Sequence, residues 1–330
     1  MEPSRAYIPL QAGQLVALDR ETGATEWSAD VATSWPPLVH DGVVYVAGDG
    51  HLHALSGTSG AAVWSVALDI GLKSPLAFQD GVLVALLDTG EVRALRSSDG
   101  QVLWTRTLTA EAGPASLTTD PTSVWLSRGG RLTRLALADG MVLWERELPG
   151  TLSPPTVAGD RLIVGSTDNT LYAFDRETGD LAWPRWRSGG DVVGATADDR
   201  FVYVASLDNL LRALQRGSGN QAWKRELTTR TTAPPLTFGG IVVVSGNDPT
   251  LSTFDARTGA PIGTLSVTAD LQGALLIDPD LKPFRVAMIA VTRDGRAIGL
   301  RPVGVMFREP PLTPLAALPG RALQREPRVR

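Results

Sequence analysis

The stretch Asp175-Arg-Glu-Thr-Gly-Asp-Leu-Ala-Trp183 recurs along this chain in near-copies of its last five positions. A glycine stands four residues before a tryptophan six times, and the steps between successive tryptophans are 37, 40, 40, 39 and 40 residues. A degenerate seventh copy stands at Gly259 and Gly263. A period near 40 residues indicates one supersecondary unit that is repeated along the chain. The six pairs are Gly23/Trp27, Gly60/Trp64, Gly100/Trp104, Gly140/Trp144, Gly179/Trp183 and Gly219/Trp223.

Residues 36–68 show what the unit contains. Short runs of β-branched, aromatic and alternating apolar residues are separated by Asp-Gly and Ser-Gly pairs, which are typical of hairpin turns. Strands this short cannot be stable alone, so successive sheets must bury one another's faces. No helical stripe competes in the repeated region. The pattern therefore predicts an all-β protein, a β-propeller of four-stranded antiparallel blades. The four strands of this unit are expected at Pro36–Val39, Val43–Val46, Leu52–Leu55 and Ala61–Val66.

The pairs of second and third strands predict eight blades, with seven as the alternative. The propeller is expected to span residues 1–307, followed by a Pro/Arg-rich C-terminal segment, 308–330. Only five residues precede Ala6, so the first unit begins at its second strand. We expect residues 313–318 to supply its missing strand and Val303–Phe307 to form the last strand of the eighth unit. The pairs lie at Tyr7–Leu18, Val43–Leu55, Val82–Leu95, Val124–Leu135, Leu162–Phe174, Phe201–Leu214, Ile241–Phe254 and Val286–Leu300.

Composition excludes several classes of function. The 330 residues include no cysteine, so disulfides, thiol nucleophiles and thiolate metal sites are excluded. No run of about 18 apolar residues is present for a membrane span, and Met1–Arg5 lacks the layout of a signal peptide. The net charge is −4; residues 301–330 hold six Arg and two Glu, which leaves −8 for residues 1–300. An acidic body argues against binding to nucleic acid.

The repeated tryptophans have two interpretations. Each glycine can supply the positive φ of a turn, while each tryptophan fills the gap between adjacent blades. Alternatively, the indoles form a row of stacking platforms for a sugar or a quinone. The regular spacing, and the position of each tryptophan on the outer strand, favour packing.

The repeated residues resemble the quinoprotein-type (PQQ-like) propeller repeat. The resemblance rests on Val-Tyr-Val, then Asp-Gly or Asp-Asn, then Leu-Tyr/His-Ala-Leu/Phe-Asp, then Glu-Thr-Gly-x-x-x-Trp, and it covers about residues 6–300. Residues Leu171–Trp183 are the nearest copy to this pattern. The family includes pyrroloquinoline-quinone alcohol dehydrogenases, outer-membrane β-barrel assembly lipoproteins of the BamB type, and sensor domains of bacterial kinases. Fold alone does not choose between these functions.

The resemblance implies a binding protein and not an enzyme. The dehydrogenases carry a vicinal Cys–Cys pair, calcium ligands and long insertions, and this chain has no cysteine and nearly uniform repeats. We therefore expect no cofactor and a scaffold that binds a protein partner, similar to the BamB-type factor and located in the cell envelope or periplasm. The chain lacks that family's lipid-bearing N-terminal Cys, and a cytoplasmic location stays open. The alternative is a small-molecule sensor for a quinone or sugar, or a degenerate dehydrogenase.

Propeller topology places blade-to-blade crossings and the hairpins between second and third strands on one face. Aspartates recur at these hairpins, but one carboxylate per blade does not make a calcium cage. His51 and His53 share one side of a strand without a third zinc ligand, so no metal is expected. The segment Trp183–Arg187 interleaves tryptophan with arginine at the expected crossing into the sixth blade, and such residues are enriched at interface hot spots. The candidate partner-binding residues are Trp35, Lys73, Arg185, Trp186, Arg187 and Arg230.

Overall fold

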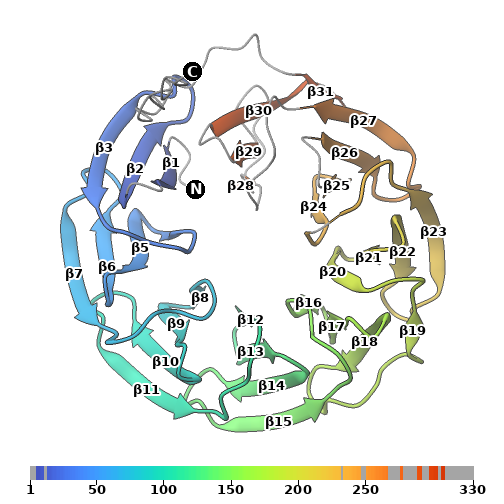
Figure 1. Ribbon diagram of the computed structural model, residues 1–330, viewed down its shortest axis with the longest axis horizontal. Helices are drawn as coiled ribbons and strands as arrows, with labels where there is room; N and C mark the ends of the chain where they lie inside the picture. The colour runs from blue at the N-terminus through green and yellow to red at the C-terminus, as the bar shows by residue number, and fades with distance from the viewer. Residues whose placement is uncertain are drawn as a thin grey trace, which may run out of the picture.

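The sheets of this protein stand around a central axis like the blades of a propeller (Figure 1). The computed structural model describes residues 5–10, 13–231, 233–246, 250–266, 276–277, 288–291, 297–303 and 306–308. These residues form seven four-stranded antiparallel sheets and one three-stranded sheet, as the repeat predicts for an all-β propeller. Within the described residues, no helix has the length and apolar composition needed to cross a membrane.

Each sheet is a meander whose strands follow the chain from the axis outward. The three-stranded sheet contains β1 (Arg5–Leu10), β2 (Gln14–Asp19) and β3 (Thr25–Asp30). The four-stranded sheets are β4 (Leu38–His40), β5 (Val43–Gly48), β6 (His51–Ser56) and β7 (Ala62–Ala67); β8 (Ala77–Gln79), β9 (Val82–Leu86), β10 (Glu91–Arg96) and β11 (Val102–Thr107); β12 (Ala115–Thr119), β13 (Ser123–Arg128), β14 (Arg131–Ala136) and β15 (Val142–Glu147); β16 (Thr156–Ala158), β17 (Arg161–Gly165), β18 (Thr170–Asp175) and β19 (Trp186–Arg187); β20 (Val192–Ala197), β21 (Phe201–Ser206), β22 (Leu210–Gln215) and β23 (Gln221–Glu226); β24 (Leu236–Phe238), β25 (Ile241–Ser245), β26 (Thr250–Asp255) and β27 (Pro261–Ser266); and β28 (Leu276–Ile277), β29 (Met288–Val291), β30 (Ala297–Val303) and β31 (Met306–Arg308).

The Asp-Gly pairs between β4 and β5 and between β8 and β9 form two-residue hairpin turns. Asp41 and Gly42 have φ of 46° and 74°, and Asp80 and Gly81 have φ of 47° and 79°. Positive φ at both central positions defines the type I′ turn, whose twist matches that of antiparallel strands. The turn residues therefore fix the register of β4 with β5 and of β8 with β9.

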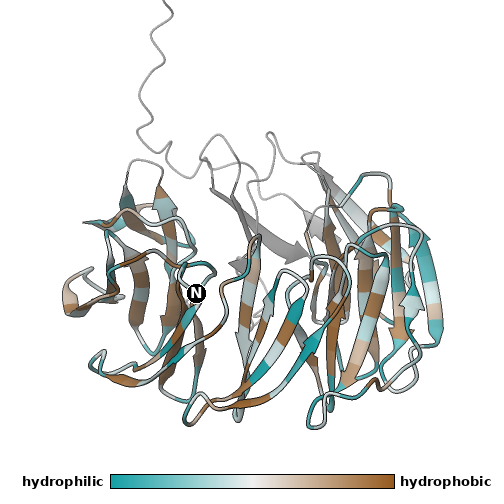
Figure 2. Ribbon diagram, turned by 60° about the horizontal axis from the view of Figure 1, so that its bottom comes forward, coloured by the Kyte–Doolittle hydropathy of each residue, from teal (hydrophilic) through white to brown (hydrophobic). Residues whose placement is uncertain are grey.

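The hydrophobic core lies between neighbouring sheets and not inside any single one. Strand alternation sends side chains to both faces of each sheet, and hydrophobic and hydrophilic residues alternate along the strands in Figure 2. In one cluster, Val84, Leu86 and Val92 of the β8–β11 sheet pack with Val124 and Leu126 of the β12–β15 sheet. Five other clusters join successive sheets in the same way within the described residues. The seven sheets from β1–β3 to β24–β27 thus depend on their neighbours for burial.

The repeated tryptophans lie at these interfaces. Trp104 is 9% exposed, and its indole Nε1 donates a hydrogen bond of 2.8 Å to the carbonyl of Leu137 in the next sheet. A Cβ on Gly140 would lie 2.5 Å from Cε3 of the same ring, so only glycine fits there. The same pairing of ring, carbonyl and glycine recurs for Trp27, Trp64, Trp144, Trp183 and Trp223. This geometry is packing between blades, because the indole N–H and the ring are engaged by the protein itself.

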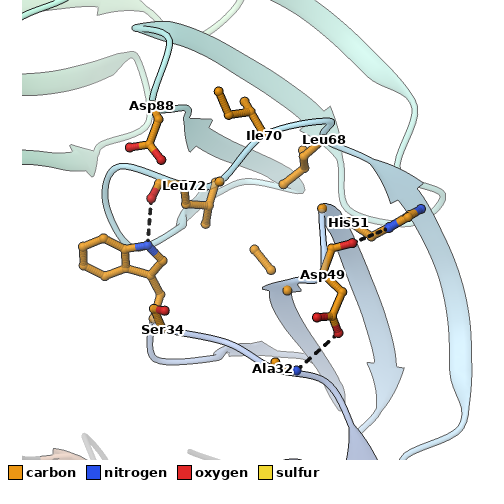
Figure 3. A pocket seen from close by; sticks show the side chains of 13 residues that line it. Ala32, Ser34, Asp49, His51, Leu68, Ile70, Leu72 and Asp88 are labelled. Atoms are coloured by element: carbon orange, nitrogen blue, oxygen red, sulfur yellow. Dashed lines mark hydrogen bonds between the residues drawn. The ribbon is translucent and has the colours of Figure 1, made fainter. Parts of the chain in front are cut away.

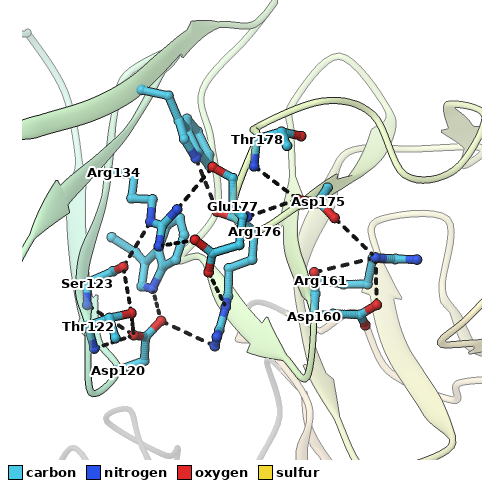
Figure 4. Close-up of polar contacts among 12 residues, drawn as sticks. Asp120, Thr122, Ser123, Arg134, Asp160, Arg161, Asp175, Arg176, Glu177 and Thr178 are labelled. Carbon is cyan, nitrogen blue, oxygen red and sulfur yellow. Dashed lines mark hydrogen bonds and ion pairs between the residues drawn. The ribbon is translucent and has the colours of Figure 1, made fainter.

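A polar network adds to the interface between the β12–β15 and β16–β19 sheets (Figure 4). The Arg134 guanidinium lies 5.1 Å from the ring centroid of Trp125, donates to Ser123 Oγ, and pairs with Glu177 across the interface at 2.9 Å. Asp120 accepts from Trp125 Nε1 at 2.6 Å and faces Arg176 at 3.4 Å. Burial opposes ionisation of Asp120, but these hydrogen bonds and Arg176 outweigh it and lower the pKa of the carboxyl. The charged groups of this network pair across the interface, Arg134 with Glu177 and Asp120 with Arg176, so the network joins the two sheets.

The outer strand β19 differs from the sequence-based expectation. Trp186 and Arg187 were placed at the crossing into the next unit, but they pair with Leu171 and Thr170 of β18. Trp183 lies before this strand, and pairing near it is limited to an isolated bridge between Leu181 and Phe174. Pro184 has no N–H to donate to β18. The ladder therefore stops near Leu181 and resumes at Trp186, and between these two points the outer segment has two more residues than β18. The prediction of a crossing position was therefore wrong.

The ends of the chain are described in part. Val303 ends β30, and the outermost strand of its sheet is Met306–Arg308, so the expected strand at Val303–Phe307 was placed too early. The sheet β1–β3 has three strands in the described part of the chain, with β1 in the second-strand position, as the sequence predicted. The proposed closing strand, residues 313–318, lies outside the described residues.

We predict that Gly140→Ala destabilises the protein more than Gly240→Ala. Both glycines have positive φ, 69° and 78°, but a Cβ at Gly240 meets no atom within 4 Å. The control should lose about 1 kcal/mol in free energy of unfolding from backbone strain. Gly140→Ala should lose a further ~1–3 kcal/mol, because the methyl group overpacks the Trp104 ring. Urea denaturation followed by tryptophan fluorescence measures both; equal losses would contradict the interlock.

Candidate functional site

A pocket of about 270 Å³ opens beside the β4–β7 sheet on the face that carries the blade-to-blade crossings (Figure 3). We call this side the crossing face; it holds residues 31–37 and 68–76, which join successive sheets, and the hairpins at residues 49–50 and 87–90. All four segments contribute to the pocket lining. Each crossing returns the chain from an outer strand to the inner strand of the next sheet. The crossings at residues 31–37 and 68–76 therefore pass on either side of the hairpin at residues 49–50 and enclose the pocket.

Trp35 forms one wall of this pocket. The side chain is partly buried, and its Nε1 donates to the Leu72 carbonyl of the following crossing at 3.0 Å. The hydroxyl of Thr33 donates to the Trp35 carbonyl and accepts from its N–H. The indole is therefore held at a defined position. The apolar part of the lining includes Leu68, Leu72 and Ile70, and Ile70 is 37% exposed.

Two carboxylates line the same pocket. Asp49 occupies the β5–β6 turn with φ of 52°, and its Oδ2 accepts a long hydrogen bond of 3.4 Å from Ala32 N. Asp88 lies in the β9–β10 hairpin, where its N–H donates to the Gly71 carbonyl. Within the described residues, no cationic side chain forms an ion pair with either carboxylate. The pocket thus combines an aromatic wall, an apolar floor and two negative charges.

The histidine pair of β6 borders this pocket, and His51 is one of the residues that line it. The rings of His51 and His53 are 5.8 Å apart, and His51 Nδ1 is 3.0 Å from the Asp49 carbonyl. Burial, followed by the neighbouring His51, lowers the pKa of His53, so its imidazole is neutral at pH 7. Among the residues that the structure describes, no group of three or more His, Asp or Glu is arranged to hold a metal ion.

Trp186 belongs to a different cluster, in the sheet β16–β19. The Arg212 guanidinium of the next sheet lies 5.2 Å from its ring centroid. Arg212 is in turn paired with Asp208, which also accepts from Ser206 Oγ at 2.6 Å and from the backbone N–H of Gly189. Burial opposes the ionisation of Asp208, but the bonds from Arg212 and Ser206 outweigh it and hold the pKa of this carboxyl below its usual range. These contacts join two sheets.

The structure does not gather the six predicted partner-binding residues into one patch. Lys73 Nζ donates to the Glu111 carbonyl, and Arg185 lies 5.9 Å from the Tyr172 ring centroid. Arg187 and Arg230 are exposed, on β19 and on the crossing after β23. Trp35 lies in the crossing between β3 and β4, and the sheet that this crossing enters, with β5–β7, stands across the ring from β19 in Figure 1. Of the six, only Trp35 lines the described pocket.

Sequence reasoning missed the pocket residues Leu68 and Ile70. They belong to the segment Leu68-Asp-Ile-Gly-Leu72, where apolar residues stand in a crossing and not in a strand. That mismatch between hydropathy and position was the available signal. A second apolar feature follows the outer strands of three successive sheets. Val63 of β7, Val102 and Leu103 of β11, and Val142 and Leu143 of β15 are between 40% and 55% exposed.

The chain is similar to known proteins in its sequence and in its fold. The family model described as outer membrane protein assembly factor BamB matches residues 11–126, 88–196 and 184–303. The chain belongs to the BamB family. The crystal structure of BamB from Moraxella catarrhalis has a TM-score of 0.62 at 22% identity, and the match covers 74% of this chain and 79% of that one. The computationally designed protein Ika8 has a TM-score of 0.76 at 17% identity, over 90% and 93% of the two chains. Comparison with curated proteins gives no match.

At these identities the two structures establish the fold alone. They agree with the architecture described above, in which repeated antiparallel sheets form a propeller. The pocket of this BamB-family chain is defined by its own side chains.

We predict that Asp208→Asn weakens this BamB-family propeller by about 3 kcal/mol at pH 7, because it leaves the buried Arg212 without its carboxylate. The native pKa of Asp208 lies below the unfolded value, so its contribution is complete above about pH 4 and is lost as pH falls through the folded pKa. The difference between wild type and variant should therefore shrink in acid. Urea denaturation at a series of pH values tests this; a constant difference would contradict the assignment.

Proposed function

We propose that this protein is a non-catalytic, eight-bladed scaffold that binds a protein partner through the pocket on its crossing face. The observation that carries the proposal is the pocket itself, where Trp35, Ile70 and two carboxylates stand open to a ligand. Elsewhere on this face the carboxylate of Asp208 and the amine of Lys73 are already bonded within the protein. Within the described residues, the pocket therefore brings together several binding groups that the protein itself does not use.

The composition of the pocket supports a protein partner over a small cofactor. Tryptophan is enriched among residues that dominate protein–protein binding energy, and such residues cluster with apolar neighbours and a polar rim. The volume of about 270 Å³ is just below the range of about 300–1,000 Å³ that is typical of cavities for drug-sized molecules. A single inserted side chain matches it better than a quinone ring system.

The eight-blade count is supported by the seven four-stranded sheets together with β1–β3. Membership of the BamB family supports a role in the cell envelope, in the assembly of outer membrane proteins. Both are part of the proposal. Scaffolding by repeated sheets also agrees with the quasi-one-dimensional build of repeat proteins, which provides a rigid surface.

We predict that Ile70→Arg weakens partner binding at least about tenfold, because a long charged side chain would fill the pocket. The matched control is Leu103→Arg on the outer strand β11, since Leu103 is similarly exposed, 42% against 37%. A partner isolated with the wild-type chain from envelope extracts is purified, and its dissociation constants for the three proteins are compared. If Leu103→Arg loses binding while Ile70→Arg keeps it, the partner binds the outer rim and the proposal fails.

A further inference from the structure

We propose that the pocket beside Trp35 receives the side chain of a lysine or arginine of the protein partner. This inference rests on the proposed function for the source of the side chain, while the chemistry of the pocket is argued from its own residues. The cation would lie between Asp49 and Asp88 and against the indole of Trp35.

Charge is the first argument. Within the described residues, equivalent hairpins of four sheets carry an aspartate, and in two of them the protein supplies the partner. Asp168 accepts from the Tyr172 hydroxyl at 2.8 Å, and Asp208 is paired with Arg212. Asp49 and Asp88 are the two that line the pocket, and within the described residues neither has an ion-pair partner. An incoming cation would satisfy charges that the fold satisfies elsewhere with its own groups.

The aromatic and apolar lining is the second argument. A cation within about 6 Å of an indole face gains ~0.5–2 kcal/mol, and tryptophan is the best aromatic partner. Lysine and arginine also carry a methylene stem that prefers apolar surroundings while the charged end stays polar. Leu68, Ile70 and Leu72 provide such a surface next to the carboxylates. An apolar side chain would use this surface but would leave both carboxylates without a partner.

A metal ion fits the pocket less well. Calcium takes six to eight oxygen ligands and magnesium near-octahedral coordination, while the described lining offers two carboxylates from different hairpins and the imidazole of His51. No group of three or more candidate ligands is present among the described residues. Organic cations need fewer ligands, because a few charged contacts and an aromatic face suffice.

The test uses 5-fluorotryptophan labelling of the full chain and 19F NMR. The nine tryptophans give separate probes, and the Trp35 signal is assigned with Trp35→Phe. The probes are the N-acetyl methylamides of arginine and lysine, with that of norleucine as the neutral analogue. We expect a saturable shift of the Trp35 signal with the cationic probes, at millimolar concentrations, and a shift about fivefold smaller or weaker with norleucine.

The deciding variant is the double substitution Asp49→Asn/Asp88→Asn, which should reduce affinity for the cationic probes about fivefold or more. Its matched control is Asp41→Asn/Asp80→Asn, which removes two charges from hairpin turns of the same two sheets at the opposite face. Asparagine tolerates the positive φ of these turns. The control should bind the probes as the wild type does, and the inference predicts weaker binding as salt concentration rises.

Two outcomes would overturn the inference. Equal shifts with norleucine and arginine would show an apolar pocket without cation preference, and equal losses in both double variants would show a general effect of net charge. The scaffold proposal is tested separately by Ile70→Arg. If the pocket binds the cationic probes but no protein partner is found, the cation site stands and the scaffold proposal fails. If Ile70→Arg loses a partner but the pocket shows no preference for cations, the scaffold proposal stands and the cation site fails.

Discussion

In the described part of the chain, the fold depends on one contact that six sheets, from β1–β3 to β20–β23, each make with the next: an indole packed on a turn glycine and bonded to a carbonyl of the same turn. Trp27 Nε1 donates to Gly57 O at 2.8 Å, and a Cβ on Gly60 would lie 2.7 Å from its ring. Each Gly-x-x-x-Trp segment therefore makes two contacts. Its glycine packs against the tryptophan of the preceding sheet, and its own tryptophan packs on the turn of the following sheet. Because sheets this small cannot persist alone, stability is a sum of such neighbour contacts.

Polar side chains vary on top of this constant contact. Arg106, Arg146 and Arg225, each two residues after the tryptophan, donate through Nε to the carbonyl of the facing glycine. Arg134 stands opposite Trp144, where the corresponding residues Ala54 and Ala94 face their tryptophans. A buried guanidinium is costly unless it is paired and hydrogen-bonded, and Trp125, Ser123 and Glu177 meet that requirement. The variation thus strengthens particular interfaces and leaves few of these groups free for a ligand.

The sequence predicted the architecture well because its signals are local. The 40-residue period, the Asp-Gly turns and the strand pairs depend on spacing and on backbone conformations that one residue type adopts. The site was harder to predict because it depends on which groups remain unpaired in three dimensions. Trp186 and Trp35 read alike in the sequence, yet Arg212 covers one ring and the other lines a pocket. Trp186 also lies in an outer strand, after the interruption at Pro184, and the spacing of the repeat alone did not indicate this position.

In a repeat protein, groups for binding a ligand are available where a repeat does not pair its own polar side chains. The hairpin aspartates occupy turn positions that favour Asp, Asn or Gly. In the β20–β23 sheet, Arg212 neutralises one of them, Asp208, which also accepts a hydrogen bond from Gly189 N in the preceding crossing. In the two sheets around Trp35 the neighbouring positions carry Leu, Ile and Trp, so the carboxylates stay uncompensated beside an apolar surface. Both carboxylates line the pocket without an ion-pair partner among the described residues, which is why the proposed ligand is a cation brought by another molecule.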